Sequence, residues 1–292
     1  MRISRLTWKV VGLIVLLAFA AFFFVPIIWV LLATTKTDTQ LTSSGPFTFG
    51  TVAHFAAAWR ALFGFQNDAM VGWLKNSAIY TFGGVAIAIL AAVPAGYGLA
   101  LTRFIGRRTL LVITLVTMIM PATALVLPLF LEINAVSLTD TAWSVILPFS
   151  FFPFGVYLCY IFFSSTIPKD LLAAARVDGC NEWGVFRHVA LPLARPVVAL
   201  VAFFAFVADW NNYYLPFVML ADNSKLPVQV GLEYLISSTE AFNPGNPGAG
   251  AELVKRPELA LAILVAIAPV ALVFLFAQRA LVRGMLAGAT KE

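Results

Sequence analysis

The chain has 292 residues, of which 61% are hydrophobic and only 11% are charged. Ordinary soluble domains contain about 45–50% apolar and about 25% charged residues. With so few charges the chain cannot cover the surface of a water-soluble domain, so its composition excludes a water-soluble fold. The two cysteines, Cys159 and Cys180, are too few for a disulfide framework and have no metal-ligand spacing around them.

Long uncharged runs predict membrane-spanning helices. A bilayer hydrocarbon core of about 30 Å needs about 20 consecutive apolar residues in a helix, and six runs meet that length. A seventh gap between charges, from Asp38 to Arg60, begins with turn-forming residues and is not counted. The predicted spans are residues 10–34, 76–101, 110–131, 142–164, 197–220 and 259–278. Prolines within these runs are expected to bend their helices, namely Pro94, Pro121, Pro128, Pro148 and Pro153.

The predicted fold class is therefore all-α, a polytopic membrane protein in which residues 1–292 form a single transmembrane domain with six helices. Most of the 19 Lys and Arg residues fall on one side when the N-terminus is placed in the cytoplasm, as the positive-inside rule requires. We expect a multi-pass protein of the cell (inner) membrane, in contact with lipid, with both termini cytoplasmic. The net charge of +5 follows from this topology and does not indicate a nucleic-acid partner.

A patterned cytoplasmic segment, residues 167–196, follows the fourth span. Its first half is a strong helix former that Gly179 ends as a C-terminal cap. Asn181 can cap a second short helix that carries Trp183 and Phe186. Two helices this short are not stable alone in water, so the segment needs a partner surface.

Two partner surfaces are considered for this segment. An amphipathic hairpin can lie on the inner leaflet without any partner protein. Three adjacent alanines, residues 173–175, argue instead for close backbone approach to another protein. The aromatic pair Trp183 and Phe186 is of the kind enriched at the centres of protein interfaces.

The same segment resembles the EAA motif of the membrane subunits of binding-protein-dependent ABC importers, E-A-A-x-x-x-G followed further on by I-x-L-P. The matching residues are Ala174, Ala175, Gly179, Val189, Leu191 and Pro192. The motif's glutamate is replaced by Ala173, so a salt bridge from that position cannot be assumed. Further stretches resemble the carbohydrate branch in order, the last of them the ending of the maltose-type second permease: residues 94–108, 120–129, 167–171, 191–196, 209–216 and 278–288.

The resemblance implies the permease subunit of an ATP-driven importer for a sugar or related polyol, forming half of the translocation path. It implies four kinds of neighbour: a second six-span permease, an ATPase dimer, an extracytoplasmic solute-binding protein and membrane lipid. The sequence has no G-x-x-x-x-G-K-[ST] phosphate loop. We therefore expect a non-enzymatic chain without cofactor, catalytic or metal-binding residues, with ATP and Mg²⁺ held by the ATPase.

Two sets of residues are expected to meet that ATPase. The coupling residues are Ala173, Ala174, Ala175, Arg176, Asp178, Gly179, Trp183, Phe186, Leu191 and Pro192. The tail residues are Gln278, Arg279, Arg283 and Gly284.

Asp209 is the one charged residue inside a predicted span. A charge at a helix centre costs roughly 2.5–3.5 kcal/mol on insertion scales, so its side chain is expected to face protein or water. In one interpretation a substrate path passes beside Asp209, Trp210, Asn211, Asn212 and Tyr213. In the other these residues form a polar cluster that packs helices together, and all five cannot share one helix face.

An alternative function is an ion-coupled secondary transporter of a small polar solute. Such a carrier needs charged or discontinuous helices in paired repeats, and one aspartate in six spans is thin support for it. A membrane-embedded enzyme lacks any convergent catalytic set.

Overall fold

The computed structural model describes residues 2–239 and 254–289, and for residues 2–6, 169 and 279–289 it describes the backbone alone. Every regular element in this described part is a helix, so the predicted all-α fold class is confirmed. The chain divides into two compact units, residues 1–71 with 231–267 and residues 72–230 with 268–292. That the whole chain acts as a single transmembrane domain stays a prediction.

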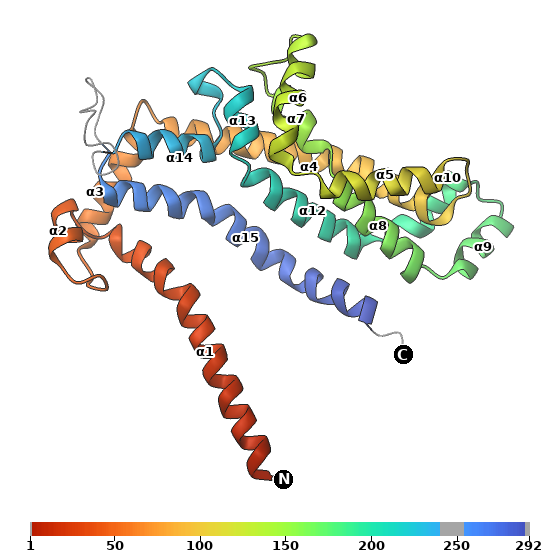
Figure 1. Cartoon of the computed structure of the whole chain (residues 1–292), viewed down its shortest axis with the longest axis horizontal. Helices are drawn as coiled ribbons and strands as arrows, with labels where there is room; N and C mark the ends of the chain where they lie inside the picture. The colour runs from red at the N-terminus through yellow and green to blue at the C-terminus, as the bar shows by residue number, and fades with distance from the viewer. Residues whose placement is uncertain (1, 240–253, 290–292) are drawn as a thin grey trace. The chain divides into compact units, whose positions relative to one another are not determined.

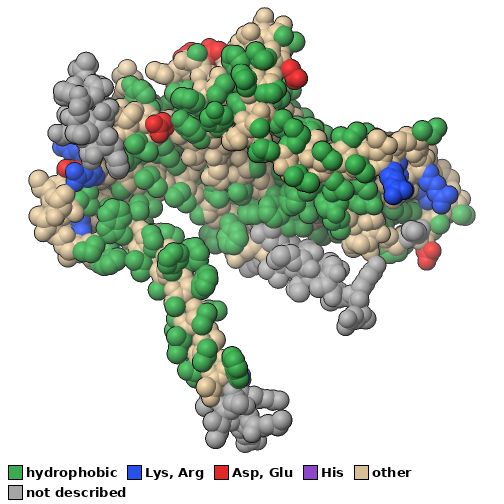
Figure 2. Space-filling model, in the orientation of Figure 1, with side chains coloured by type: hydrophobic (Ala, Val, Ile, Leu, Met, Phe, Trp, Pro, Cys, Tyr) green, Lys and Arg blue, Asp and Glu red, His purple; other side chains and the backbone are tan. Residues whose placement is uncertain are grey.

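The first unit begins with the long N-terminal helix, which is exposed along most of its length (Figure 1). Its elements are α1 (Arg2–Ala33), α2 (Asp38–Ser43), α3 (Val52–Gly64), most of α14 (Val228–Ser237) and the beginning of α15 (Arg256–Ala289). Apolar side chains are exposed along α1, and Figure 2 shows the hydrophobic surface that they make. After α1 the side chain of Lys36 is buried, and its Nζ donates to the carbonyl of Gly45 at 2.8 Å. An apolar surface of this kind suits a helix that faces lipid or a partner helix.

The second unit contains the remaining helices. Its longer helices are α4 (Ala69–Leu101), α5 (Arg107–Ile119), α6 (Ala122–Ala135), α7 (Trp143–Ser150), α8 (Pro153–Thr166) and α12 (Arg195–Trp210). Its short elements are α9 (Lys169–Val177), α10 (Glu182–Val185), a π-helical turn (Phe186–Ala190), α11 (Leu191–Leu193), α13 (Tyr214–Met219) and a 3₁₀ turn (Asn223–Lys225). α8 packs against α5 and α12, and α13 packs against α6 and α7 (Figure 1).

Four continuous stretches of the described residues are long and apolar enough to cross a membrane, and they match the first, second, fourth and sixth predicted spans. These are Thr7–Ala33, Ala69–Leu101, Trp143–Thr166 and Arg256–Gln278. The third predicted span is two helices, α5 and α6, bent by 108°. The fifth is α12, which follows the preceding short helices at a bend of 75°. If each bent pair is one span, the described part of the chain has six.

The breaks inside the third and fifth predicted spans, between α5 and α6 and between α12 and α13, have local causes. Met120 precedes a proline and adopts an extended conformation (φ −69°, ψ 128°), which ends α5 and produces the predicted bend at Pro121. At the end of α12 the side chain of Asn211 donates to the Val207 carbonyl at 2.8 Å. Asn212 Oδ1 accepts from Leu215 N at 3.2 Å. Asparagine side chains that bond the backbone compete with helical hydrogen bonds, so α12 stops and α13 starts separately.

A buried apolar cluster joins α4, α8 and α12 to the segment between α9 and α11. Its members include Val93, Tyr97, Cys159, Phe163, Leu172, Ala175, Val185, Phe186, Ala190, Ala194 and Val201. The close approach of α4 to α8 requires a glycine, because a Cβ on Gly96 would lie 2.3 Å from the Cβ of Cys159. The segment from α9 to α11 therefore packs on apolar side chains of α4, α8 and α12.

Candidate functional site

The segment from α9 to α11, here called the hairpin, folds as its local signals predict. Gly179 has φ +89°, a left-handed conformation that suits glycine. Gly179 N donates to the Arg176 carbonyl at 3.1 Å and Cys180 N to the Ala175 carbonyl at 3.0 Å, the two bonds of a Schellman cap. Asn181 Oδ1 accepts from Gly184 N at 2.8 Å and caps α10. Both predicted caps are confirmed.

Most of the predicted coupling residues lie on the exposed side of the hairpin. The exposed ones are Ala173, Ala174, Arg176, Asp178, Gly179, Trp183, Leu191 and Pro192. Ala175 and Phe186 are instead buried in the apolar cluster. The rings of Trp183 and Phe186 lie 5.4 Å apart, with Trp183 62% and Phe186 5% exposed. Phe186 thus packs beneath the exposed surface of the hairpin, and Trp183 forms part of that surface.

The hairpin is also attached to α4 by polar groups. Arg176 Nε lies 2.7 Å from Glu182 Oε1, which joins α9 to α10. The hydroxyl of Tyr97, on α4, donates to Glu182 Oε2 at 3.2 Å. The Tyr97 ring packs against Phe163 and Phe186, with centroids 5.6 and 5.0 Å away. Sequence analysis did not single out Tyr97 or Glu182.

A cavity of about 300 Å³ lies among α6, α7, α12 and α13. Of the five predicted path residues, Asp209 and Asn212 line it. Asp209 is only 8% exposed, and among the described residues its Oδ2 has no hydrogen-bond partner. A Cβ added to Gly84 of α4 would lie 2.9 Å from that oxygen. The backbone of α4 thus passes directly beside the Asp209 carboxyl group.

The other three predicted path residues do not line this cavity. Trp210 is buried and stacks on Phe206 with centroids 5.6 Å apart. Asn211 is exposed and bonds the backbone of its own helix. Tyr213 stacks on Phe217 with centroids 5.3 Å apart. The structure therefore brings together two of the five.

Phe151 is a cavity residue that sequence analysis missed. It lies at the break between α7 and α8 and is 65% exposed. It lines the Asp209 cavity and two further cavities of about 250 and 450 Å³. The nearby Pro148 and Pro153 were the available signal, since prolines interrupt helices, and here the break falls at Phe151 and Phe152.

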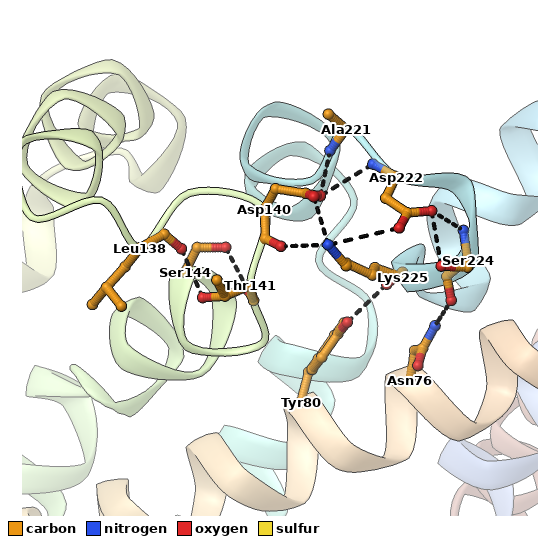
Figure 3. Close-up of polar contacts among 10 residues, drawn as sticks. All are labelled: Asn76, Tyr80, Leu138, Asp140, Thr141, Ser144, Ala221, Asp222, Ser224 and Lys225. Carbon is orange, nitrogen blue, oxygen red and sulfur yellow. Dashed lines mark hydrogen bonds and ion pairs between the residues drawn. The ribbon is translucent and has the colours of Figure 1, made fainter.

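A second polar cluster, here called the clamp, joins the loop before α7 to the loop after α13 (Figure 3). Lys225 Nζ donates to the Asp140 backbone carbonyl at 2.8 Å and pairs with both the Asp140 and Asp222 carboxylates. Asp140 Oδ1 accepts from Ala221 N at 3.0 Å and Asp222 N at 3.1 Å. The Lys225 ammonium group, helped by these backbone donors, lowers the pKa of Asp140 to about 2.

The clamp is tied to α4 as well. Tyr80 donates its hydroxyl to the Lys225 carbonyl at 2.8 Å (Figure 3). Asn76 Nδ2 donates to the carbonyls of Ser224 at 2.8 Å and Leu226 at 3.1 Å. No sequence motif indicated this cluster. The spacing of Asp222 and Lys225, three residues apart, was the only local signal.

The predicted tail lies on α15. The side chain of Gln278 is exposed and donates to the Leu275 carbonyl at 2.9 Å. Arg279, Arg283 and Gly284 lie on the part of α15 whose side chains are outside the described residues. Within the described residues no group of three or more His, Cys, Asp or Glu side chains is placed to hold a metal ion.

The family model for the "binding-protein-dependent transport system inner membrane component" matches residues 84–287. The chain is similar to the polygalacturonan/rhamnogalacturonan transport system permease protein YtcP of Bacillus subtilis, with 31% identity over 94% of this chain and 95% of that protein. It is also similar to the lactose transport system permease protein LacG of Rhizobium radiobacter, with 30% identity over 92% of each chain.

A solved structure resembles the fold over nearly the whole length. This is the crystal structure of a bacterial ABC transporter involved in the import of the acidic polysaccharide alginate, with a TM-score of 0.80 and 26% identity. The match covers 94% of this chain and 97% of that one.

Proposed function

Because the chain belongs to the family of binding-protein-dependent transport system inner membrane components, we propose that it is a permease subunit for a sugar or oligosaccharide, of the maltose-type second-permease kind. A member of this family is a membrane-embedded permease and not itself an enzyme, since its ATPase is a separate subunit. The same membership disfavours the ion-coupled carrier considered above. The carbohydrate assignment is supported by relatives named for transport of polygalacturonan/rhamnogalacturonan and of lactose.

The proposed complex contains a second six-span permease, an ATPase dimer that binds ATP and Mg²⁺, and an extracytoplasmic solute-binding protein. An importer of this family implies the ATPase and the substrate-binding protein, and the rest of this composition is our proposal. We place both termini in the cytoplasm, because that orientation puts most Lys and Arg residues inside. In this topology the hairpin is cytoplasmic and the clamp is extracytoplasmic.

The exposed side of the hairpin is the proposed ATPase-docking surface. Trp183 and Val177 are 62% and 86% exposed, an arrangement that leaves apolar area for a partner to cover. Beneath this surface the hairpin is packed on α4, α8 and α12, so displacement of the hairpin would move those helices as bodies. The tail of α15 is proposed as a second contact with the ATPase.

The Asp209 cavity is the proposed part of the sugar path, and the unpartnered carboxyl oxygen is the observation that carries this assignment. Buried polar atoms are normally hydrogen-bonded, and Asp209 Oδ2 lacks a partner within the described chain. Because Asp209 lines the cavity, a sugar hydroxyl there can supply one when the carboxyl group turns away from Gly84. Asn212 can donate and accept at the same cavity. Ligand sites for small molecules typically combine such a few polar groups with apolar walls, here including Phe151.

Uptake by the purified importer in proteoliposomes tests this function. We expect radiolabelled lactose, maltodextrin or a pectic oligosaccharide to enter only with ATP and the binding protein. Uptake driven by a proton or sodium gradient without ATP would contradict the proposal. Within a working importer, Asp209→Ala is expected to alter the rate or apparent affinity of uptake more than the yield of assembled complex. A loss of assembly alone would instead assign Asp209 to helix packing.

A further inference from the structure

Helix α4 makes polar contacts near both of its ends. Near its start, Asn76 and Tyr80 bond the backbone of the clamp. Near its end, Tyr97 bonds Glu182 of the hairpin. At about 1.5 Å rise per residue, Asn76 and Tyr97 lie about 32 Å apart along the helix, close to the bilayer core thickness of about 30 Å. One helix is therefore attached to structures on both sides of the proposed membrane position.

The attachment at the hairpin is directional because Tyr97 is buried. Tyr97 is 5% exposed and lies between Phe163 and Phe186, so its hydroxyl reaches Glu182 from a fixed ring. Glu182 Oε2 accepts from the Tyr97 hydroxyl and from Arg176 Nη2, and Glu182 Oε1 accepts from Arg176 Nε. The carboxylate therefore joins α4, α9 and α10 at one point.

Between its ends α4 passes the carboxyl group of Asp209, a residue that lines the cavity. Gly84 is buried, and a Cβ at that position would lie 2.7 Å from the Phe149 Cβ and 2.9 Å from Asp209 Oδ2. Such contact leaves no free space between the α4 backbone and these groups, so a shift of α4 along its axis must displace Asp209 or Phe149.

We propose that Tyr97 and Glu182 are positioning residues which fasten the hairpin to α4, so that α4 carries hairpin displacement to the Asp209 cavity and the clamp. This inference rests on the proposed function, since it takes the hairpin to be the part that the ATPase moves. Arg176 then acts inside the chain, by holding the Glu182 carboxylate toward Tyr97.

The Arg176–Glu182 ion pair contributes too little to folding stability to explain this arrangement. Its side chains are 41% and 56% exposed, and exposed ion pairs contribute little to folding. The apolar cluster already holds the hairpin against α8 and α12. The polar link adds a fixed position of the Tyr97 hydroxyl of α4 relative to the two hairpin helices, α9 and α10.

The test uses Tyr97→Phe and Glu182→Leu in the reconstituted importer, because the first removes the donor of the link and the second its acceptor, each with little change in side-chain volume. We expect the number of solute molecules moved per ATP to fall about fivefold, the factor that corresponds to loss of one net hydrogen bond. The double variant should be no worse than either single variant, since both cut the same link. ATPase co-purification and ATP hydrolysis should persist.

Tyr160→Phe is the matched control, because Tyr160 lies on α8 and no hydrogen bond from its hydroxyl is present among the described residues. It should transport as the unmodified chain does. Unchanged coupling in Tyr97→Phe, or additive losses in the double variant, would overturn the inference.

A second readout is independent of the solute. A cysteine placed at the exposed Lys75 of α4, with Cys180 replaced by serine, is labelled by a membrane-impermeant maleimide with and without ATP and vanadate. We expect the nucleotide to change the labelling rate in the parent chain and to change it less in Tyr97→Phe. An equal nucleotide effect in both would refute the link, whereas a parent importer that moves no sugar would refute the proposed function alone.

Discussion

The clamp and the hairpin link each pair a carboxylate with a basic side chain, and each is hydrogen-bonded to α4, but they are built from different kinds of atoms. Asp140 accepts from two backbone N–H groups, and Asn76 and Tyr80 bond backbone carbonyls of the clamp. The hairpin link is made of three side chains, those of Arg176, Glu182 and Tyr97. Backbone partners fix the loops themselves, whereas side-chain partners can separate without unfolding either element. The clamp is therefore suited to holding a structure, and the link to transmitting a movement.

Charge reversal at the clamp tests this difference between the two clusters, and we expect it to have the largest effect. The double variant Asp140→Lys with Lys225→Asp restores a pair of opposite charges but leaves the N–H groups of Ala221 and Asp222 without their acceptor. It also places a second carboxylate next to Asp222. We expect a several-fold lower yield of folded protein and no rescue relative to the single variants. Size-exclusion chromatography in detergent measures this yield.

At the hairpin, by contrast, the double charge reversal is expected to restore part of the coupling that each single variant loses. Arg176→Glu and Glu182→Arg should each lower solute moved per ATP by about fivefold, a factor equivalent to about 1 kcal/mol. The double variant keeps the pair across α9 and α10 and should recover part of that loss, with an arginine now facing the Tyr97 hydroxyl as a donor to its oxygen. Transport and hydrolysis are measured together in proteoliposomes. Recovery at the clamp but not at the hairpin would reverse our assignment of the two clusters.

How much of this could be predicted from the sequence depends on how local each feature is. The caps at Gly179 and Asn181 and the bend at Pro121 follow from neighbouring residues, and all three were predicted. The clamp was not, because Asp140 and Lys225 are far apart in the sequence and meet only through packing of α6, α7 and α13.

The aromatic pair of the hairpin shows an intermediate case. Trp183 and Phe186 are three residues apart and were expected to act together at an interface. Their rings lie 5.4 Å apart, and their joint role at an interface stays a prediction. Their opposite exposures could not be anticipated, because they depend on the π-helical turn that starts at Phe186 and on the α4 and α8 rings beneath it. Asp209 was singled out correctly as unusual, yet its cavity is formed by helices distant in sequence.

A substitution at the C-terminal cap of α9 tests whether backbone strain in the hairpin lowers coupling while the hairpin stays attached to the ATPase. Gly179 has φ +89° and open space where a Cβ would project, so Gly179→Val adds backbone strain without a clash. A left-handed conformation costs an L-residue roughly 1–2 kcal/mol. We expect assembly with the ATPase to be retained and coupling to fall several-fold. Gly179→Asn is the control, since asparagine tolerates this conformation, and it should lie near the parent value.

The smallest expected effect is on the pH dependence of thermal stability in the acid range. The pKa of Asp140 is lowered to about 2 from an ordinary value of 3.8, so its contribution to stability is fully present above about pH 4 and is lost as the pH falls through about 2. Asp140→Asn should therefore have a lower Tm than the parent chain at pH 7 and pH 5 by similar amounts, with the difference shrinking below pH 4.

Thermal unfolding of the detergent-purified protein, followed by tryptophan fluorescence, measures this difference. Glu233→Gln is the control, because Glu233 is exposed and makes no ion pair within the described part of the chain. Its Tm difference from the parent should be small at every pH. A parent-to-variant difference for Asp140→Asn that instead disappears between pH 7 and pH 5 would mean that the carboxylate is not held by Lys225 and the backbone donors. The clamp would then be no firmer than the hairpin link.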